Sequence, residues 1–246
     1  MIFIKSGKKD WIRIIETINF IKHTNMYKED SNIKIEFENF IRNKNFPCVA
    51  AIAALKREQI MIYMADNMAC PKDDQGILKF IYEFTDIYRK SDEDFFSAAV
   101  IFRSPDICKE GVFENLLWQR LQALAVLDSG KFDYDNRVSA KPLSPDFSFS
   151  LKKEAFFVIG MNPASSRTSR KFKYPVLIFN PHEQFTKLRK FNRYDKMKKI
   201  IRRRDIAYSG SVNPMLNDFA KVSEATQYSG ADHDKKWKCP LKIRNS

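Results

Sequence analysis

The chain has 246 residues, of which 44% are hydrophobic and 13% aromatic, so it can bury a substantial core and is neither disordered nor fibrous. Its apolar runs are shorter than the roughly 18 residues that span a bilayer, and its first residues lack a signal-peptide pattern, so we expect a soluble cytoplasmic protein. The net charge of +13 is uneven, because residues 1–150 carry 21 basic and 22 acidic side chains whereas residues 151–246 carry 22 and 8. This imbalance indicates a surface or site for anions, such as nucleic acid, an acidic partner, phosphate or haem propionate.

Apolar spacing and turn residues predict the elements of the first half in chain order. These are two helices within residues 10–44, strands over 48–55 and 59–65 forming an antiparallel hairpin, a helix over 73–90, a strand over 97–102 and a helix over 109–127. The alanine-rich segment CVAAIAAL at the first of these strands also fits a helix. Residues 131–151 are polar and too long for a minimal connection, so they form either a lid over a site or an ordinary surface loop.

The second half centres on residues 156–205. Apolar runs predict strands over 156–161 and 175–179 on either side of a polar loop rich in Ser and Arg. Asn180-Pro181 is a helix-start signal, which places His182 at the mouth of a helix with one apolar and one strongly basic face. Beyond residue 206 the pattern indicates irregular structure.

Together these elements predict an α+β fold with a mainly antiparallel sheet of about five strands and helices packed largely on one side. We expect a single domain over residues 1–246. The four cysteines, Cys48, Cys70, Cys108 and Cys239, form no CxxC pair, which indicates reduced thiols rather than a disulfide framework or a zinc site. Any single cysteine could still ligate a metal or haem.

Seven ordered blocks of sequence carry a resemblance to a known family. They are FPCVAA (46–51), FFVIGMNPASSRTSR (156–170), VLIFNPHEQFTKLR (176–189), IRRRD (201–205), GSVNPML (210–216), SEATQYSG (223–230) and WKCP (237–240). In this order they resemble the YqcI/YcgG family over residues 37–241, which makes residues 1–36 a helical N-terminal extension. That family includes the guanitoxin-pathway enzyme and a cycloserine-pathway arginine hydroxylase, which are haem-dependent oxygenases that hydroxylate guanidino nitrogens.

The resemblance implies that this chain binds haem b, uses O2 as co-substrate and hydroxylates a guanidino nitrogen of arginine or a related compound. An electron donor would be a further partner, and a homodimer is left open. The chain departs from the family at Asn162, where many members have His. If that His ligates the iron in those members, this chain needs another ligand or is not an active haem enzyme.

Haem iron is held by His, Cys, Met or Tyr. His182 lies in a block that matches the family, unlike His23 and His233, and is the preferred axial ligand; its alternative role is to satisfy a buried hydrogen bond at the helix terminus. Cys48 and Cys239 are competing thiolate ligands, although buried cysteines more often act as small apolar residues.

Three arginines of the matching blocks could pair with haem propionates, because a guanidinium matches a carboxylate with two donors. They are Arg167, Arg170 and Arg189, and their alternative role is a solvated basic surface. Asn162 and the arginine loop would then form one wall of the cofactor site and His182 the other.

A guanidinium substrate requires carboxylates, and the candidates are Glu183, Asp205 and Glu224. As structural alternatives, Glu183 would favour the helix N-terminus and Asp205 would pair with the neighbouring arginines. Two other functions remain open, which are haem binding without catalysis and nucleic-acid binding through the basic helix. The second is disfavoured because the aromatic residues lie on the apolar face of that helix and no nucleic-acid motif is present.

Overall fold

The computed structural model describes residues 26–191, 193–211, 222–234 and 236–243. Residues 26–42 are helical, which confirms the second helix predicted within residues 10–44; the first lies outside the described residues, as does most of the GSVNPML block. The chain divides into two compact units, Met1–Asn39 and Phe40–Ser246. The sheet and all predicted site residues belong to the second unit, and the single domain stays a prediction.

A five-stranded sheet of order β1-β2-β5-β4-β3 organises the second unit. Its strands are β1 (Ile60–Asn67), β2 (Ser97–Ser104), β3 (Phe149–Leu151), β4 (Glu154–Met161) and β5 (Val176–Pro181). β1 and β2 are parallel and the other three pairs are antiparallel, so the predicted α+β class with a mainly antiparallel sheet is confirmed. The short strand β3 was not predicted.

The predicted hairpin at residues 48–65 is wrong. Its first arm is the helix α2 (Val49–Lys56), and Cys48 caps it by accepting a hydrogen bond from the Ala51 N–H at 3.4 Å. Four alanines in eight residues favour a helix, and a helix leaves β1 free to pair with β2 in parallel through the crossover helix α3 (Asp74–Arg89).

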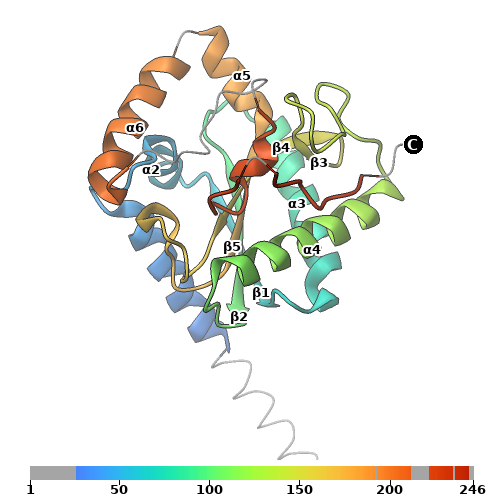
Figure 1. Cartoon of the computed structure of the whole chain (residues 1–246), viewed down its shortest axis with the longest axis horizontal. Coiled ribbons are helices and arrows are strands. Elements are labelled where there is room, and N and C mark those ends of the chain that lie inside the picture. Colours follow the sequence, from blue (N-terminus) through green and yellow to red (C-terminus); the bar gives the residue numbers. More distant parts are fainter. Residues whose placement is uncertain (1–25, 192, 212–221, 235, 244–246) are drawn as a thin grey trace, which may run out of the picture. The chain divides into compact units, whose positions relative to one another are not determined.

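The main core lies between the sheet and the helices α3 and α4 (Glu110–Ser129). Both helices bury apolar residues at spacings of three and four, and the apolar residues of β2 from Ala98 to Phe102 are all fully buried. Figure 1 shows α3 and α4 together beside the sheet, with α2, α5 (His182–Lys190) and α6 (Tyr194–Ser209) gathered on another side.

The single helix predicted after residue 181 is two helices, α5 and α6, because the chain leaves helical geometry after Lys190. Its predicted apolar face is only partly buried, since Phe191 is 67% exposed and Ile200 is 41% exposed. Short 3₁₀ turns complete the fold at η1 (Pro71–Asp73), η2 (Thr168–Arg170) and η3 (Glu224–Gln227). In the described part of the chain, no helix combines the length and apolarity that crossing a membrane requires.

Candidate functional site

The predicted site residues fall at opposite ends of the β4–β5 pair. In its antiparallel register Phe156 lies opposite Pro181 and Met161 opposite Val176, and these two levels are about 17 Å apart. Asn162 therefore follows one end of the pair and His182 the other. The structure does not bring them together as facing walls of one site.

At the Asn162 end, the arginine loop is held by internal contacts. Asn162 is buried, and its side-chain oxygen accepts a hydrogen bond from the Ala164 N–H at 2.9 Å. Arg167 donates to Asp205 Oδ2 at 2.6 Å and to the Ser211 carbonyl at 2.8 Å. Because Arg167 and Asp205 are both buried, this ion pair ties the loop to α6 and occupies the groups that a propionate or a substrate would need.

Arg170 is also committed internally. Its guanidinium donates to the main-chain carbonyls of Tyr228 at 3.1 Å and Gly160 at 3.4 Å. Burial, and next the nearby Arg167, lower the pKa of Arg170 to about 10, which leaves it charged at neutral pH. Gly230 packs against it with φ +81°, and a Cβ at that position would lie 2.6 Å from Arg170 Cδ.

At the other end, His182 begins α5 directly after β5 and is only 8% exposed. Burial, and after it the guanidinium groups of Arg189 and Arg137, lower the pKa of His182 to about 4, although Asp135 opposes them. The imidazole is therefore neutral at physiological pH, which is the form that can coordinate a metal. Arg189 also stacks over the Tyr194 ring at 4.7 Å.

Glu224 lies at the same end of the β4–β5 strand pair as His182. Its Oε1 accepts hydrogen bonds from the hydroxyls of Ser148 at 2.6 Å and Tyr228 at 2.7 Å, and both hydroxyls lie near the carbonyl of Phe156. Burial raises the pKa of Glu224 to about 8 against the effect of these donors and of Arg189. Glu224 is thus a neutral carboxylic acid at pH 7, and Arg189 influences both it and His182.

A charge network beside His182 was not predicted from the sequence. Arg137 forms a two-bond fork with Asp135 at 2.6 and 2.9 Å, and donates to Glu154 at 2.9 Å and to Glu183 at 3.0 Å. Arg89 contacts the other oxygen of Glu154 at 3.2 Å. Arg137 belongs to the loop over residues 131–148, so the segment suspected of being a lid is fastened here to β4 and α5.

The two cysteine candidates are protonated thiols. Cys48 is partly buried at the start of α2, and its desolvation there raises the pKa of the thiol. Burial likewise raises the pKa of Cys239 to about 12. Both thiols would have to lose their proton to bind iron, because the thiolate is the form that coordinates a metal.

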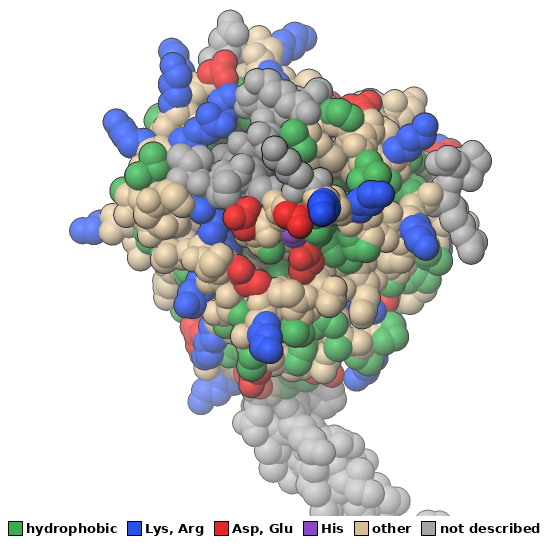
Figure 2. Space-filling model, viewed as in Figure 1, with side chains coloured by type: hydrophobic (Ala, Val, Ile, Leu, Met, Phe, Trp, Pro, Cys, Tyr) green, Lys and Arg blue, Asp and Glu red, His purple; other side chains and the backbone are tan. Residues whose placement is uncertain are grey.

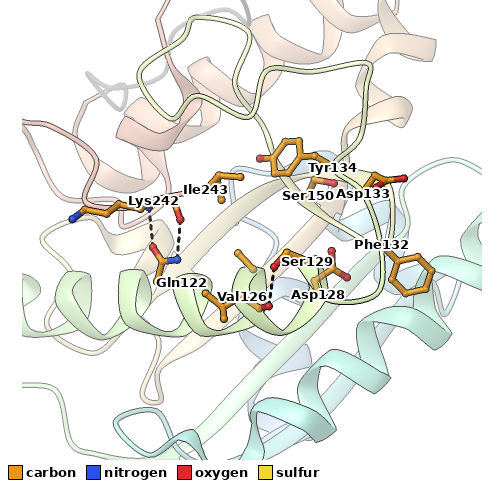
Figure 3. Close-up of a pocket in the computed structure, with 11 residues that line it drawn as sticks. Gln122, Val126, Asp128, Ser129, Phe132, Asp133, Tyr134, Ser150, Lys242 and Ile243 are labelled. Atoms are coloured by element: carbon orange, nitrogen blue, oxygen red, sulfur yellow. Dashed lines mark hydrogen bonds between the residues drawn. The ribbon is translucent and has the colours of Figure 1, made fainter. Parts of the chain in front are cut away.

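A small pocket at the C-terminal end of α4 is lined by none of the predicted site residues (Figure 3). Its volume is about 60 Å³, well below the roughly 300 Å³ at which small-molecule sites begin. The Gln122 side chain closes one side by exchanging two hydrogen bonds with the backbone of Lys242, at 2.8 and 2.9 Å. This pocket explains none of the predicted site residues.

Figure 2 shows Asp and Glu side chains gathered around a histidine near the middle of one face, with Lys and Arg side chains both beside this group and along the outline of the molecule. Of the C-terminal residues, His233 lies 3.3 Å from Glu114 and stacks on Trp237 with ring centroids 4.2 Å apart.

Within the described ranges, no group of three or more His, Cys, Asp or Glu side chains could hold a metal ion.

The structure places four of the predicted site residues at one end of the sheet, namely His182, Glu183, Arg189 and Glu224. The prediction from the sequence missed Asp135, Arg137 and Glu154, which lie in the long loop and at the first position of β4. The only signal for them was the unusual length of that loop.

The comparisons with known proteins bear on the whole second unit. Searches of the curated proteins and of the solved structures found no match. The model of the YqcI/YcgG family matches residues 37–242, which cover most of the chain and contain every residue of the site. The chain therefore belongs to the YqcI/YcgG family.

Proposed function

We propose that this protein is a haem-dependent oxygenase that hydroxylates a guanidino nitrogen of arginine or a related compound, and that it works in the cytoplasm. The observation that supports this proposal best is the buried, neutral imidazole of His182 at the β5–α5 junction, within a charge network rich in carboxylates. The four free cysteines agree with a reducing compartment.

The donors that haem b requires would come from the β5–α5 junction. His182 would supply a nitrogen ligand to the iron, and Arg189 is a nearby cation that could pair with a propionate. The arginine loop does not fit that role, because Arg167 and Arg170 are already bonded to Asp205 and to main-chain carbonyls at the other end of the strands. Haem, when bound, would activate O2.

The substrate would be recognised by carboxyl groups on the His182 side. Glu183 is 35% exposed and already accepts a guanidinium hydrogen bond, from Arg137. Glu224 is a neutral carboxylic acid there, able to donate a hydrogen bond or a proton. Asp205, by contrast, belongs to the buried pair with Arg167, which argues for a structural role.

Transfer of one oxygen atom of O2 into an N–H bond, with reduction of the other to water, takes two electrons and two protons. The protein therefore needs an electron donor in addition to its guanidino substrate.

The first test is the absorption spectrum of the protein reconstituted with haemin. We expect a Soret band that His182→Ala abolishes or shifts, whereas His233→Ala, which removes a histidine stacked on Trp237, leaves it unchanged. No Soret band in the wild-type protein would contradict a haem role. An unchanged band in His182→Ala would place the iron ligand elsewhere.

The second test is incubation of the haem-loaded protein with arginine, a reductant and O2, followed by mass analysis. We expect a product that has gained one oxygen atom. If a panel of guanidino compounds gives no oxygenated product although the Soret band is present, haem binding without catalysis is the better account.

A further inference from the structure

The exposed face of α6 combines positive charge with aliphatic side chains. Lys196, Lys199 and Arg203 are exposed at spacings of three and four, which places them on one stripe of the helix. Ile200 and Ile206 flank this stripe and are 41% and 50% exposed. We call these five residues the α6 face.

The charge around the α6 face is strongly one-sided. Residues 182–209 carry ten Lys or Arg side chains against three acidic ones, and of the three acidic ones Asp205 is buried in its pair with Arg167. Figure 2 shows Lys and Arg side chains projecting along the side on which Figure 1 places α6. Such a surface attracts an anionic macromolecule over distances of about 10 Å.

The exposed isoleucines distinguish between the two kinds of anionic partner. Contacts to nucleic-acid phosphates are polar and gain nothing from aliphatic side chains such as Ile200 and Ile206. Protein interfaces, in contrast, combine an apolar centre with a polar or charged rim. The composition of the α6 face therefore favours an acidic protein surface with an apolar centre.

The position of the α6 face suggests what that protein does. The helix α5 begins at His182, ends at Lys190 and packs against α6, and its length is about 13 Å. The N-terminal end of α6, where Lys196 lies, is thus about one short helix away from the proposed iron ligand, whereas Asp205 near the other end of α6 pairs with Arg167 at the opposite end of the β4–β5 pair. Docking sites for electron transfer are small and depend on charge, as this surface does.

We propose that the α6 face is the docking site of a small acidic electron-transfer protein, of the flavodoxin or [2Fe–2S] ferredoxin type. This inference rests on the proposed function, because it supplies the two electrons that hydroxylation consumes. It adds a surface and a class of partner to that function.

The test compares two charge-reversal variants of the haem-loaded protein. The first is Lys196→Glu/Lys199→Glu/Arg203→Glu. The matched control is Lys72→Glu/Lys79→Glu/Lys131→Glu, which changes the net charge equally at three other exposed positions. The measurement is the rate of haem reduction by a reduced flavodoxin at low ionic strength, with dithionite as a small reductant that needs no docking surface.

We expect the α6 variant to be reduced by flavodoxin at least about tenfold more slowly than the wild type, and the control variant much less so. Reduction by dithionite should be equal in all three proteins. An equal loss in both variants would mean that only net charge matters and would overturn the docking site. So would an unchanged rate in the α6 variant.

A binding measurement keeps this inference separate from the proposed function. Calorimetry with oxidised flavodoxin needs no haem, and we expect binding to the wild type and the control but not to the α6 variant. Binding without any Soret band would overturn the proposed function alone, whereas arginine hydroxylation without flavodoxin binding would overturn the docking site alone. Retention of a single-stranded RNA by the α6 face, without flavodoxin binding, would replace the proposed partner by nucleic acid.

Discussion

At the scale of single residues, the buried carboxyl of Glu224 has the clearest consequence for stability. In the unfolded chain it ionises near its ordinary pKa of about 4.3. In the folded chain, burial raises the pKa to about 8, so the native state holds a proton that the unfolded state loses. Between these two values the free energy of unfolding must therefore decrease as the pH rises.

Glu224→Gln should remove this dependence, because glutamine is neutral at every pH and its Oε1 can still accept from Ser148 and Tyr228. We expect the wild type to lose about 3 kcal/mol relative to the variant between pH 5 and pH 7. Urea unfolding at pH 5, 6, 7 and 8 measures this difference. The exposed Glu93→Gln is the control, and parallel pH profiles for wild type and Glu224→Gln would refute the raised pKa.

The residue scale also separates what the sequence could predict from what it could not. A helix does begin at His182 as predicted, but Asn180 and Pro181 belong to β5, and the Asn180 side chain bonds Ser97 and the Phe157 carbonyl instead of capping the helix. Arg137 and Glu154 are 17 positions apart and meet only because the loop folds back onto β4, so no local pattern reveals them. The partners of Arg167 were likewise hidden, although Asp205 had been singled out.

At the scale of secondary-structure elements, a buried ion pair connects segments that lie outside the sheet. The pair of Arg167 with Asp205 connects the loop after β4 to α6, whose only fully buried residue is Asp205. When one partner of a buried pair is removed, the other is left as an uncompensated charge. This contact therefore helps to attach α6, together with the hydrogen bonds from Arg204 to the Phe46 carbonyl and the packing of Tyr208 on Phe46.

Asp205→Asn should lower the free energy of unfolding by about 3 to 5 kcal/mol, because it leaves the Arg167 guanidinium buried without its counter-charge. The double variant Arg167→Met/Asp205→Leu should recover most of that loss. Asp94→Asn, which removes a partner of the exposed Arg193, should cost less than about 1 kcal/mol. Urea unfolding checks all three, and purely additive effects in the double variant would contradict the coupling.

The wrong prediction of a strand at residues 48–55, where the structure has the helix α2, also belongs to the scale of secondary-structure elements. Residues 48–55 lack polar punctuation, so the run of alanines and aliphatic residues fits a buried strand and a helix equally well. The tertiary structure decides between them, because β1 pairs with β2 instead of with residues 48–55, which precede β1 in the chain. The long amphipathic helices α3 and α4 were predicted within about two residues, because their apolar spacing has no alternative.

At the scale of the whole molecule, the network around Arg137 joins four parts of the fold. Its members come from the loop over 131–148, from β4, from α5 and, through Arg89, from α3. The carboxylates of Asp135 and Glu154 are almost fully buried, whereas Arg137 itself is 45% exposed. Arg137 thus covers two buried negative charges from the solvent side.

Arg137→Ala should lower the free energy of unfolding by about 2 kcal/mol, because it leaves these carboxylates with less compensation. Arg57→Ala is a matched control, since Arg57 is 47% exposed but its ion-pair partner is the exposed Glu93, at 3.7 Å, and its other contact is with the Phe95 ring at 5.8 Å. We expect that control to cost less than about 1 kcal/mol. Thermal unfolding at pH 7 compares the two, and equal losses would show that the buried carboxylates do not matter.

The order of the strands also sets the timing of folding during synthesis. The strand β2 lies between β1 and β5, and its Ala98 pairs with Phe179, about 80 residues later in the chain. At about 5 to 20 residues per second, the ribosome needs about 4 to 16 seconds to supply β5 after β2 has been made. Throughout that interval one edge of β2, whose residues Ala98 to Phe102 are fully buried in the native fold, has no partner, so the nascent chain should need a chaperone until β5 arrives.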